Sequence, residues 1–278
     1  MHLECASNST RAGGRWWVSS MRIVQNDAGP IPPLAEWHDN KTYCWITTLP
    51  RHAIAWEFLR RYPRYRDAYA RQGNAAGFER SEWPMVRLED PMLDAYHAVP
   101  AWTMTVCDEI LPVVSGESPL DALRSAFDLD RLSCQMQMIE DEDATHIVFA
   151  YCGRQLQLEM HTRPNAGTGI FTPAVAPASL AGKRTLALRR LADLAEHGTL
   201  RDHLYPAEAR ALRMARILQA LDGAMAGARH RDIAVGLFGE RRVIRDWGLP
   251  GNHLRDHVRR AIAHGRMLMS GGFVRLLG

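Results

Sequence analysis

The sequence predicts an α+β protein with helices near both ends and a small, mainly antiparallel sheet in between. Near both ends, apolar residues recur every three to four positions, which indicates amphipathic helices. In the middle, short β-branched and aromatic runs are bounded by proline and glycine, which is typical of strands. Because 278 residues exceed the usual single-domain size, we expect several parts. These are a flexible segment over 1–40, a helical module over 41–80, an acidic β-containing region over 82–200 and a helical domain over 204–278.

Charge is unevenly distributed along the chain. The net charge of +3 conceals a charge of −8 over residues 81–200 and +7 over residues 201–278. A genome rich in arginine codons explains why all but two of the basic residues are arginine, but it does not explain their clustering. Such asymmetry indicates a polyanionic partner for the carboxy-terminal part.

Several classes of protein are excluded by what the sequence lacks. No apolar run is long enough for a membrane span, and the first 25 residues contain no continuous hydrophobic segment, so we expect a soluble cytoplasmic protein without a membrane partner. The five cysteines are scattered and form no C-x-x-C pair, which indicates reduced thiols. No phosphate-binding loop, nucleophile elbow or metal-ligand set is present. We therefore expect no enzyme activity, no cofactor and no metal.

The amino-terminal module is predicted from RHAIAWEFLRRYPRYRDAYARQ, which has helical spacing on both sides of Pro63. Proline fits the first turn of a helix, so we expect a helix, a break at Pro63 and a second helix. The nearby arginines form a nucleic-acid patch or a solvated face around a small aromatic core, and we favour the second interpretation. They are Arg60, Arg61, Arg64, Arg66 and Arg71.

The middle region contains a hairpin signal in HIVFAYCGRQLQLEM. Ile147 to Tyr151 is β-branched and aromatic, and Cys152-Gly153 lies where a tight turn is expected. Four successive carboxylates precede the first strand, at residues 140–143; they form a metal site or, as we favour, a solvated loop. Residues 185–196 have helical spacing and end at His197-Gly198.

The carboxy-terminal domain is predicted to contain three helices. The first follows Pro206 and has an apolar stripe with Arg210, Arg213 and Arg216 outside it. The second is short, lies in RHRDIAVGLFG and stops at Gly239. We expect a loop over RRVIRDWGLPGN, with Trp247 filling the domain core. The third helix covers residues 253–270, is capped by Asn252 and ends at Gly271-Gly272.

The third helix has distinct faces. Its predicted core stripe consists of Leu254, Val258, Ala261, Gly265, Leu268 and Met269. Arg255, Arg259 and Arg266 form an exposed strip on one flank. Arg260 and three histidines, His253, His257 and His264, occupy the other flank. The histidines suggest a metal site, but no further ligand lies on that face, so we favour solvated or groove-facing side chains.

A short helix followed by a longer helix with outward arginines is the arrangement that places a helix in a DNA major groove. Guanidinium groups can bind guanine bidentately or neutralise phosphates. Spacing alone leaves a second interpretation open, because many helical hairpins expose arginines to solvent.

The strings HRDIAVGLFGE and LRDHVRRAIAHGRMLMSGGFVRLL, with Trp247 between them, resemble the RovC-like transcription-factor DNA-binding domain family over about 70 residues. Separately, AWEFLRRYPRYRDAY looks like a transcriptional-regulator-like module of proteobacterial proteins. The layout is similar to activators encoded on integrative and conjugative elements. The resemblance implies a regulator of promoters for element excision, transfer or a secretion system, and it carries over Arg231, Arg255, Arg259 and Arg260.

From the residues and the resemblance together, we expect a homo-oligomeric helix-turn-helix regulator that binds a promoter repeat in double-stranded DNA. RNA polymerase or an antiactivator protein is a further expected partner. The alternative is a protein-interaction module, such as an antiactivator that sequesters another regulator. The predicted DNA-binding residues are Arg229, Arg231, Asn252, His253, Arg255, Arg259, Arg260 and Arg266.

Overall fold

The computed structural model describes residues 19–21, 36–71, 82–141, 143–170, 172, 181–248 and 253–278. The chain divides into two compact units that do not follow chain order. The first, here called the sheet unit, comprises Met1–Ala28, Glu79–Leu88 and Val99–Leu204. The second, the helical unit, comprises Gly29–Phe78, Glu89–Ala98 and Tyr205–Gly278.

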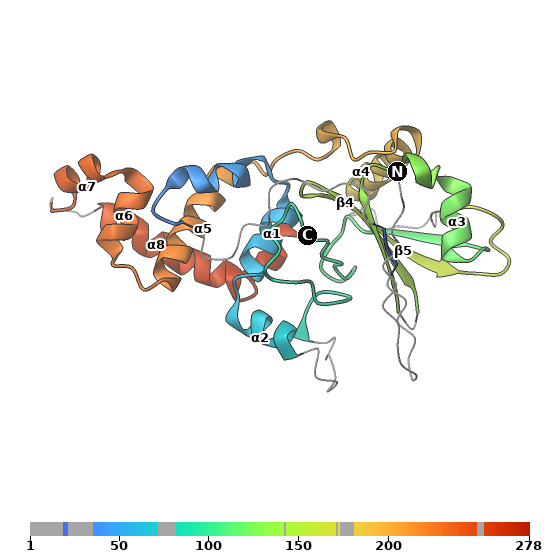
Figure 1. The fold of residues 1–278 in the computed structure, drawn as a ribbon, viewed down its shortest axis with the longest axis horizontal. Helices are drawn as coiled ribbons and strands as arrows, with labels where there is room; N and C mark the ends of the chain where they lie inside the picture. Colours follow the sequence, from blue (N-terminus) through green and yellow to red (C-terminus); the bar gives the residue numbers. More distant parts are fainter. Residues whose placement is uncertain are drawn as a thin grey trace. The chain divides into compact units, whose positions relative to one another are not determined.

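The sheet unit is built on a five-stranded sheet in the order β1-β3-β4-β5-β2. Three of its four strand pairs are antiparallel, and only β2 and β5 run parallel. The mixed helix and sheet content confirms the predicted α+β class (Figure 1). The strands are β1 (Ser19–Met21), β2 (Leu111–Ser115), β3 (Gln135–Glu140), β4 (Thr145–Tyr151) and β5 (Arg154–Thr162).

The predicted hairpin is formed by β4 and β5. Tyr151 pairs with Arg154, and the two residues between them have positive φ angles, 48° at Cys152 and 78° at Gly153. Two successive positive φ angles define the tight turn whose twist matches that of paired strands. The hairpin predicted from the sequence is therefore confirmed, including its turn residues.

The acidic run begins at Glu140, the last residue of β3, so the predicted loop does not include this residue. The backbone N–H of Asp141 donates to the carbonyl of Ala144 at 2.8 Å, so this residue belongs to the turn into β4. Glu142 lies outside the described residues. Within the described ranges, no three or more His, Cys, Asp or Glu side chains are grouped so as to hold a metal.

Two α-helices accompany the sheet, α3 (Pro119–Ala126) and α4 (Ala181–His197). The end of α4 agrees with the prediction, because Gly198 has a φ of 69° and its N–H donates to the carbonyl of Leu194 at 2.8 Å. None of the helices in the described ranges has the length and apolar character needed to span a membrane.

The helical unit combines the amino-terminal module with the carboxy-terminal helices. In Figure 1 the blue segment that carries η1 and α1 lies beside the orange and red helices. Helix α5 packs against η1 and α8, and α1 packs against η7 and α8. Its elements are η1 (Asn40–Thr48), α1 (Arg51–Leu59), α2 (Pro63–Arg71), α5 (Ala211–Met225), α6 (His230–Phe238), α7 (Glu240–Asp246), α8 (His253–Met269) and η7 (Gly272–Leu276).

Trp37 connects the amino-terminal module to helices α5 and α6. Its carbonyl accepts a hydrogen bond of 2.9 Å from Gln219 of α5, whose amide also donates to the carbonyl of Gly236 in α6 at 3.0 Å. A Cβ atom on Gly236 would lie 2.9 Å from the same Trp37 oxygen, so only glycine permits this approach. A residue far upstream thus forms part of the core around α5 and α6.

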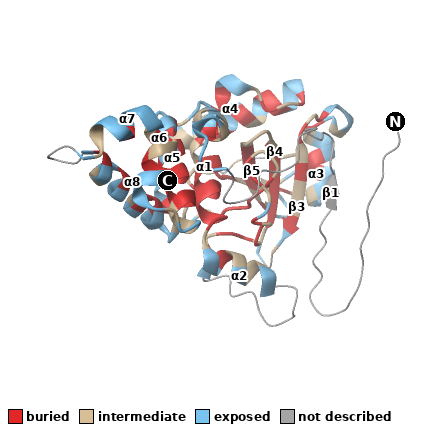
Figure 2. Ribbon diagram, turned by 60° about the vertical axis from the view of Figure 1, so that its left-hand side comes forward, coloured by how far each residue is buried: buried red, intermediate tan, exposed pale blue. Residues whose placement is uncertain are grey.

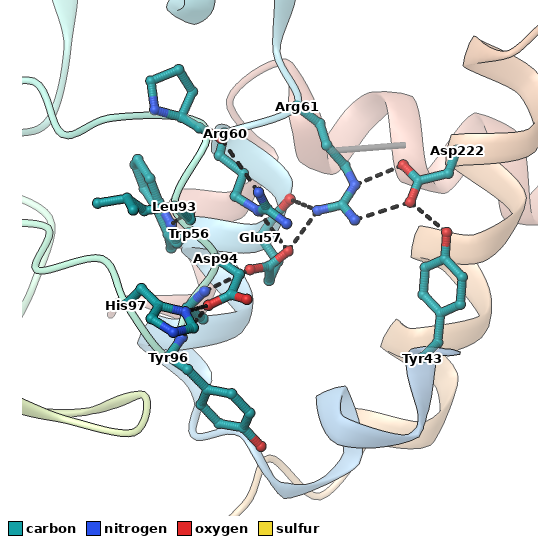
Figure 3. Close-up of polar contacts among 12 residues, drawn as sticks. Tyr43, Trp56, Glu57, Arg60, Arg61, Leu93, Asp94, Tyr96, His97 and Asp222 are labelled. Atoms are coloured by element: carbon teal, nitrogen blue, oxygen red, sulfur yellow. Dashed lines mark hydrogen bonds and ion pairs between the residues drawn. The ribbon is translucent and has the colours of Figure 1, made fainter. Parts of the chain in front are cut away.

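A buried ionic network joins α1, α5 and η1 (Figure 3). The guanidinium of Arg61 donates to both carboxylate oxygens of Asp222, at 2.6 and 2.9 Å, and to Oε2 of Glu57 at 2.6 Å. The hydroxyl of Tyr43 donates to Asp222 at 2.6 Å. Burial alone would lower the pKa of Arg61, but Asp222 and Glu57 outweigh it, so the pKa is raised and the charge is held.

The arginines of the amino-terminal module require a correction. Arg60 and Arg61 are 0% and 2% exposed, so they form neither a nucleic-acid patch nor a solvated face. Arg60 donates to Glu57 at 2.8 Å and to the carbonyl of Pro91 at 3.3 Å. The favoured interpretation is wrong for these two residues, which directly follow α1, because Glu57 and Asp222 pair with their guanidinium groups inside the unit. Arg64 and Arg71 are exposed and Arg66 is half-buried.

The segment between α6 and α8 also differs from the prediction. Residues Glu240 to Asp246 form helix α7 rather than a loop. Trp247 is only half-buried and does not fill the core; Val243 is buried there instead. The predicted end of the second helix at Gly239 is confirmed. Helix α7 could not be recognised from the sequence, because a two-turn helix with one buried side chain, Val243, shows no apolar period.

Replacing Asp222 with alanine leaves the buried Arg61 guanidinium without its main partner. We expect the free energy of unfolding to fall by about 3–5 kcal/mol, as for other broken buried ion pairs. Chemical denaturation followed by circular dichroism measures this. The matched control is Asp256→Ala, because that carboxylate is 47% exposed and its loss should change stability by less than about 1 kcal/mol. Equal effects of the two changes would contradict a structural role for the network.

Candidate nucleic-acid interface

Helix α8 is amphipathic and turns one face to the unit's core. A Cβ atom on Gly265 would lie only 3.0 Å from Cβ of Leu221, so α8 approaches α5 closely at this point. Ala261 and Met269, predicted in the core stripe, are half-buried, and Ile262 is buried instead. The opposite face is therefore left to solvent, as the blue exposed positions of α8 in Figure 2 show. The buried residues are Leu254, Val258, Ile262, Gly265 and Leu268.

The predicted arginine strip lies on the exposed side of α8. Arg255, Arg259 and Arg266 are all exposed. Arg259 lies 3.1 Å from Asp256, and both side chains are largely in solvent. The Arg255 guanidinium lies 5.5 Å from the ring centroid of Trp247. Because exposed pairs of this kind are weak, these side chains can turn toward a ligand at little cost.

The other predicted residues lie near the amino ends of two helices. Arg229 and Arg231 are exposed at the start of α6, and His253 is exposed at the start of α8. Arg260 is exposed on the second flank of α8. Asn252, predicted as the cap of α8, lies outside the described residues, so its position and its capping role stay predictions.

A groove of about 700 Å³ lies between α5, α8 and the end of α6. Its floor includes the buried Ile217 and Leu237, together with Phe238, whose ring meets that of His257 edge-on at 5.4 Å. Within the part of the chain that the structure describes, no aspartate or glutamate lines this groove. The charged and titratable residues that line it are Arg210, Arg213, Arg216, His257, Arg260 and His264.

The pKa values of the two histidines in the groove reflect this concentration of positive charge. The pKa of His257 is lowered, first by desolvation and then by the positive charges of Arg260, Arg216, Arg213 and Arg242. Desolvation, followed by Arg213, lowers the pKa of His264. Both imidazoles therefore remain neutral at pH 7, and the guanidinium groups supply the positive charge of the groove.

The sequence placed Arg260 and three histidines on one flank of α8, and the groove includes Arg260, His257 and His264 but not His253. Sequence reasoning missed the opposite wall, which Arg213 and Arg216 of α5 provide. Their three-residue spacing indicated a basic outer face of a core-facing helix. Only the packing of α5 against α8 places that face opposite Arg260.

Helix α7 adds arginines that sequence reasoning did not assign to a site. Arg241, Arg242 and Arg245 are exposed, and the last two lie near Asp246, at 3.7 and 2.7 Å. The Arg242 guanidinium also lies 5.3 Å from the ring centroid of Phe238. They were missed because the segment was predicted to be a loop.

A helical unit that exposes arginines on neighbouring helices, with few facing carboxylates, has the electrostatic character of a nucleic-acid-binding protein. Residues 173–278 match the family model of the RovC DNA-binding domain, described as "T6SS, Transcription factor, DNA binding domain". Residues 36–87 match the proteobacterial transcriptional regulator-like domain. Both resemblances stated from the sequence are thus confirmed, and together they support a DNA-binding transcriptional regulator. A search of curated proteins gives no match.

The matched regions do not coincide with the compact units. The 173–278 match begins ahead of the helical unit and includes α4, which belongs to the sheet unit. The 36–87 match includes η1, α1 and α2, which pack within the helical unit. Both regions therefore contribute to the unit that carries α8.

Because positive charges around His257 disfavour its imidazolium form, removing one should raise its pKa. We expect the NMR titration midpoint of His257 to lie below 6.5 in the wild-type protein and to rise toward 6.5 in Arg260→Ala. Arg255→Ala is the control, because this arginine lies on the other flank of α8 and should leave the midpoint unchanged. An identical midpoint in wild type and Arg260→Ala would show that the two groups do not interact.

Proposed function

We propose that this protein is a sequence-specific transcriptional regulator that binds promoter DNA through α8, with α6 and α8 acting as a helix-turn-helix unit. The observation that carries the proposal is the exposure of Arg255, Arg259, Arg260 and Arg266 on a helix whose opposite face is buried. The transcription-factor domain matched over residues 173–278 supports it.

The dimensions of α8 suit this role. Its 17 residues give a helix of about 25 Å, and the major groove is wide enough to admit a helix. Arginines near its start, Arg255 and Arg259, would read base edges, because a guanidinium can donate two hydrogen bonds to guanine. Arg229 and Arg231, at the start of α6, would contact phosphates alongside.

The regulated promoters are proposed to be those of a secretion system or of mobile-element excision and transfer, with the protein acting as an activator. The first choice is suggested by the description of the matched family, which names a type VI secretion system. One helix spans only a few base pairs, so specificity would require a homo-oligomer on a repeated site. Such a regulator would act in the cytoplasm, without catalysis, and would contact RNA polymerase.

Replacing Arg255 and Arg259 with alanine should abolish specific binding without unfolding the protein. Each lost bidentate base contact costs about 1–3 kcal/mol, so we expect affinity to fall at least about 30-fold. The measurement selects bound fragments from the host's genomic DNA, maps the protected site by footprinting and titrates that fragment by fluorescence anisotropy.

The control is Arg124→Ala with Arg131→Ala, two exposed arginines of the sheet unit that lie outside the matched region 173–278. Arg124 is well matched to Arg259, because each pairs with an aspartate three residues earlier in a helix. Thermal unfolding should be nearly unchanged in both double variants. Normal promoter binding by Arg255→Ala/Arg259→Ala would refute the assignment of α8, and a stable protein complex without DNA binding would favour the antiactivator alternative.

A further inference from the structure

We propose that the groove between α5 and α8 holds the sugar-phosphate backbone of the bound duplex, with Arg213, Arg216 and Arg260 as phosphate contacts. This deepens the proposed function and rests on it. It assigns to α5, which the sequence indicated only as a core-facing helix, a direct part in DNA binding.

The positive charge of the groove favours binding of an anion. Arginines from two helices face the same space, and among the described residues none of Arg213, Arg216 and Arg260 is within ion-pair distance of a carboxylate. Guanidinium groups held together without a counter-charge repel one another, and a phosphate chain between them would remove that repulsion.

The position of the groove connects it to the outer face of α8. Successive residues of a helix are 100° apart, so Arg259 and Arg260 lie on either side of the direction that points away from the core. Arg260 is exposed on α8 and also lines the groove. A duplex that contacts Arg255 and Arg259 with its bases would thus bring a flanking backbone to Arg260 and across to α5.

The groove suits a polyanion of phosphates better than an acidic amphipathic peptide. Such a peptide binds largely by burying apolar side chains. Here the apolar floor is already covered, since Ile217 is 4% and Leu237 is 7% exposed. Among the large apolar side chains of the groove in the described ranges, Leu212 is 58% exposed and Phe238 is half-buried.

Protonation of His257 gives a second way to test the proposal. Around His257 lie Arg260 of its own helix, Arg213 and Arg216 of α5, Arg242 of α7 and the Phe238 ring of α6. A phosphate placed among these groups would favour the imidazolium form, so DNA binding should take up protons and tighten as the pH falls from 8 to 6.

The test is the variant Arg213→Ala/Arg216→Ala, in the full chain, titrated with the selected genomic fragment and with an unrelated duplex of equal length. Both arginines are exposed, so the protein should stay folded. Loss of two phosphate contacts should reduce the slope of log K against log salt by about 1.8. At 0.1 M salt this corresponds to binding weaker by on the order of 60-fold, equally for both duplexes.

The comparison with Arg255→Ala/Arg259→Ala separates the two proposals. That variant should lose preference for the selected fragment, whereas the α5 variant should keep the preference and show a weaker dependence of affinity on salt. An unchanged salt slope in the α5 variant, with wild-type DNA binding intact, would overturn the groove assignment and leave the proposed function standing. Absence of DNA binding by the wild-type protein would overturn both. Loss of poly-glutamate binding with an unchanged DNA salt slope would assign the groove to an acidic protein partner instead.

Discussion

The helical unit depends on the buried guanidinium of Arg61. Removing a charge from water costs several kcal/mol, so it must be matched where it is buried. Here Asp222 and Glu57 match it, and Tyr43 completes the hydrogen bonding of Asp222. Because Arg61 and Asp222 are 161 residues apart in the chain, this one interaction fixes α1 against α5. Helix α5 in turn supports α8 at Gly265 and provides one wall of the basic groove.

This constraint changes how the two matched regions are understood. Residues 36–71, which make up most of the regulator-like region, share one core with the carboxy-terminal helices in the helical unit, so the two matched regions are not structurally independent. Trp37 packs between α5 and α6, and Arg51 donates to the carbonyls of Arg275 and Gly278 at 3.0 and 2.9 Å. The upstream region therefore holds both the start and the end of the helical array from α5 to η7.

The arrangement gives α8 two chemically different flanks. One carries Arg255, Arg259 and Arg266 on an exposed surface, where weakly paired guanidinium groups can turn to form directional hydrogen bonds. The other carries Arg260 and faces the arginines of α5 across a concave surface, where charge is concentrated. An exposed helix face suits a DNA groove and a concave cationic face suits a sugar-phosphate backbone, so exposure and charge distinguish the two roles proposed for one helix.

Local spacing determined a large part of this structure. The helices on both sides of Pro63, the turn at Cys152-Gly153 and the outward arginines of α8 depend on neighbours within about four residues, and all were predicted. The motifs of the two matched regions are likewise continuous in sequence. Tertiary packing alone decided that Arg60 and Arg61 are buried and that the arginines of α5 face Arg260. The reason is physical: whether an arginine meets water, a carboxylate or another arginine depends on residues distant in the chain, which no local period records.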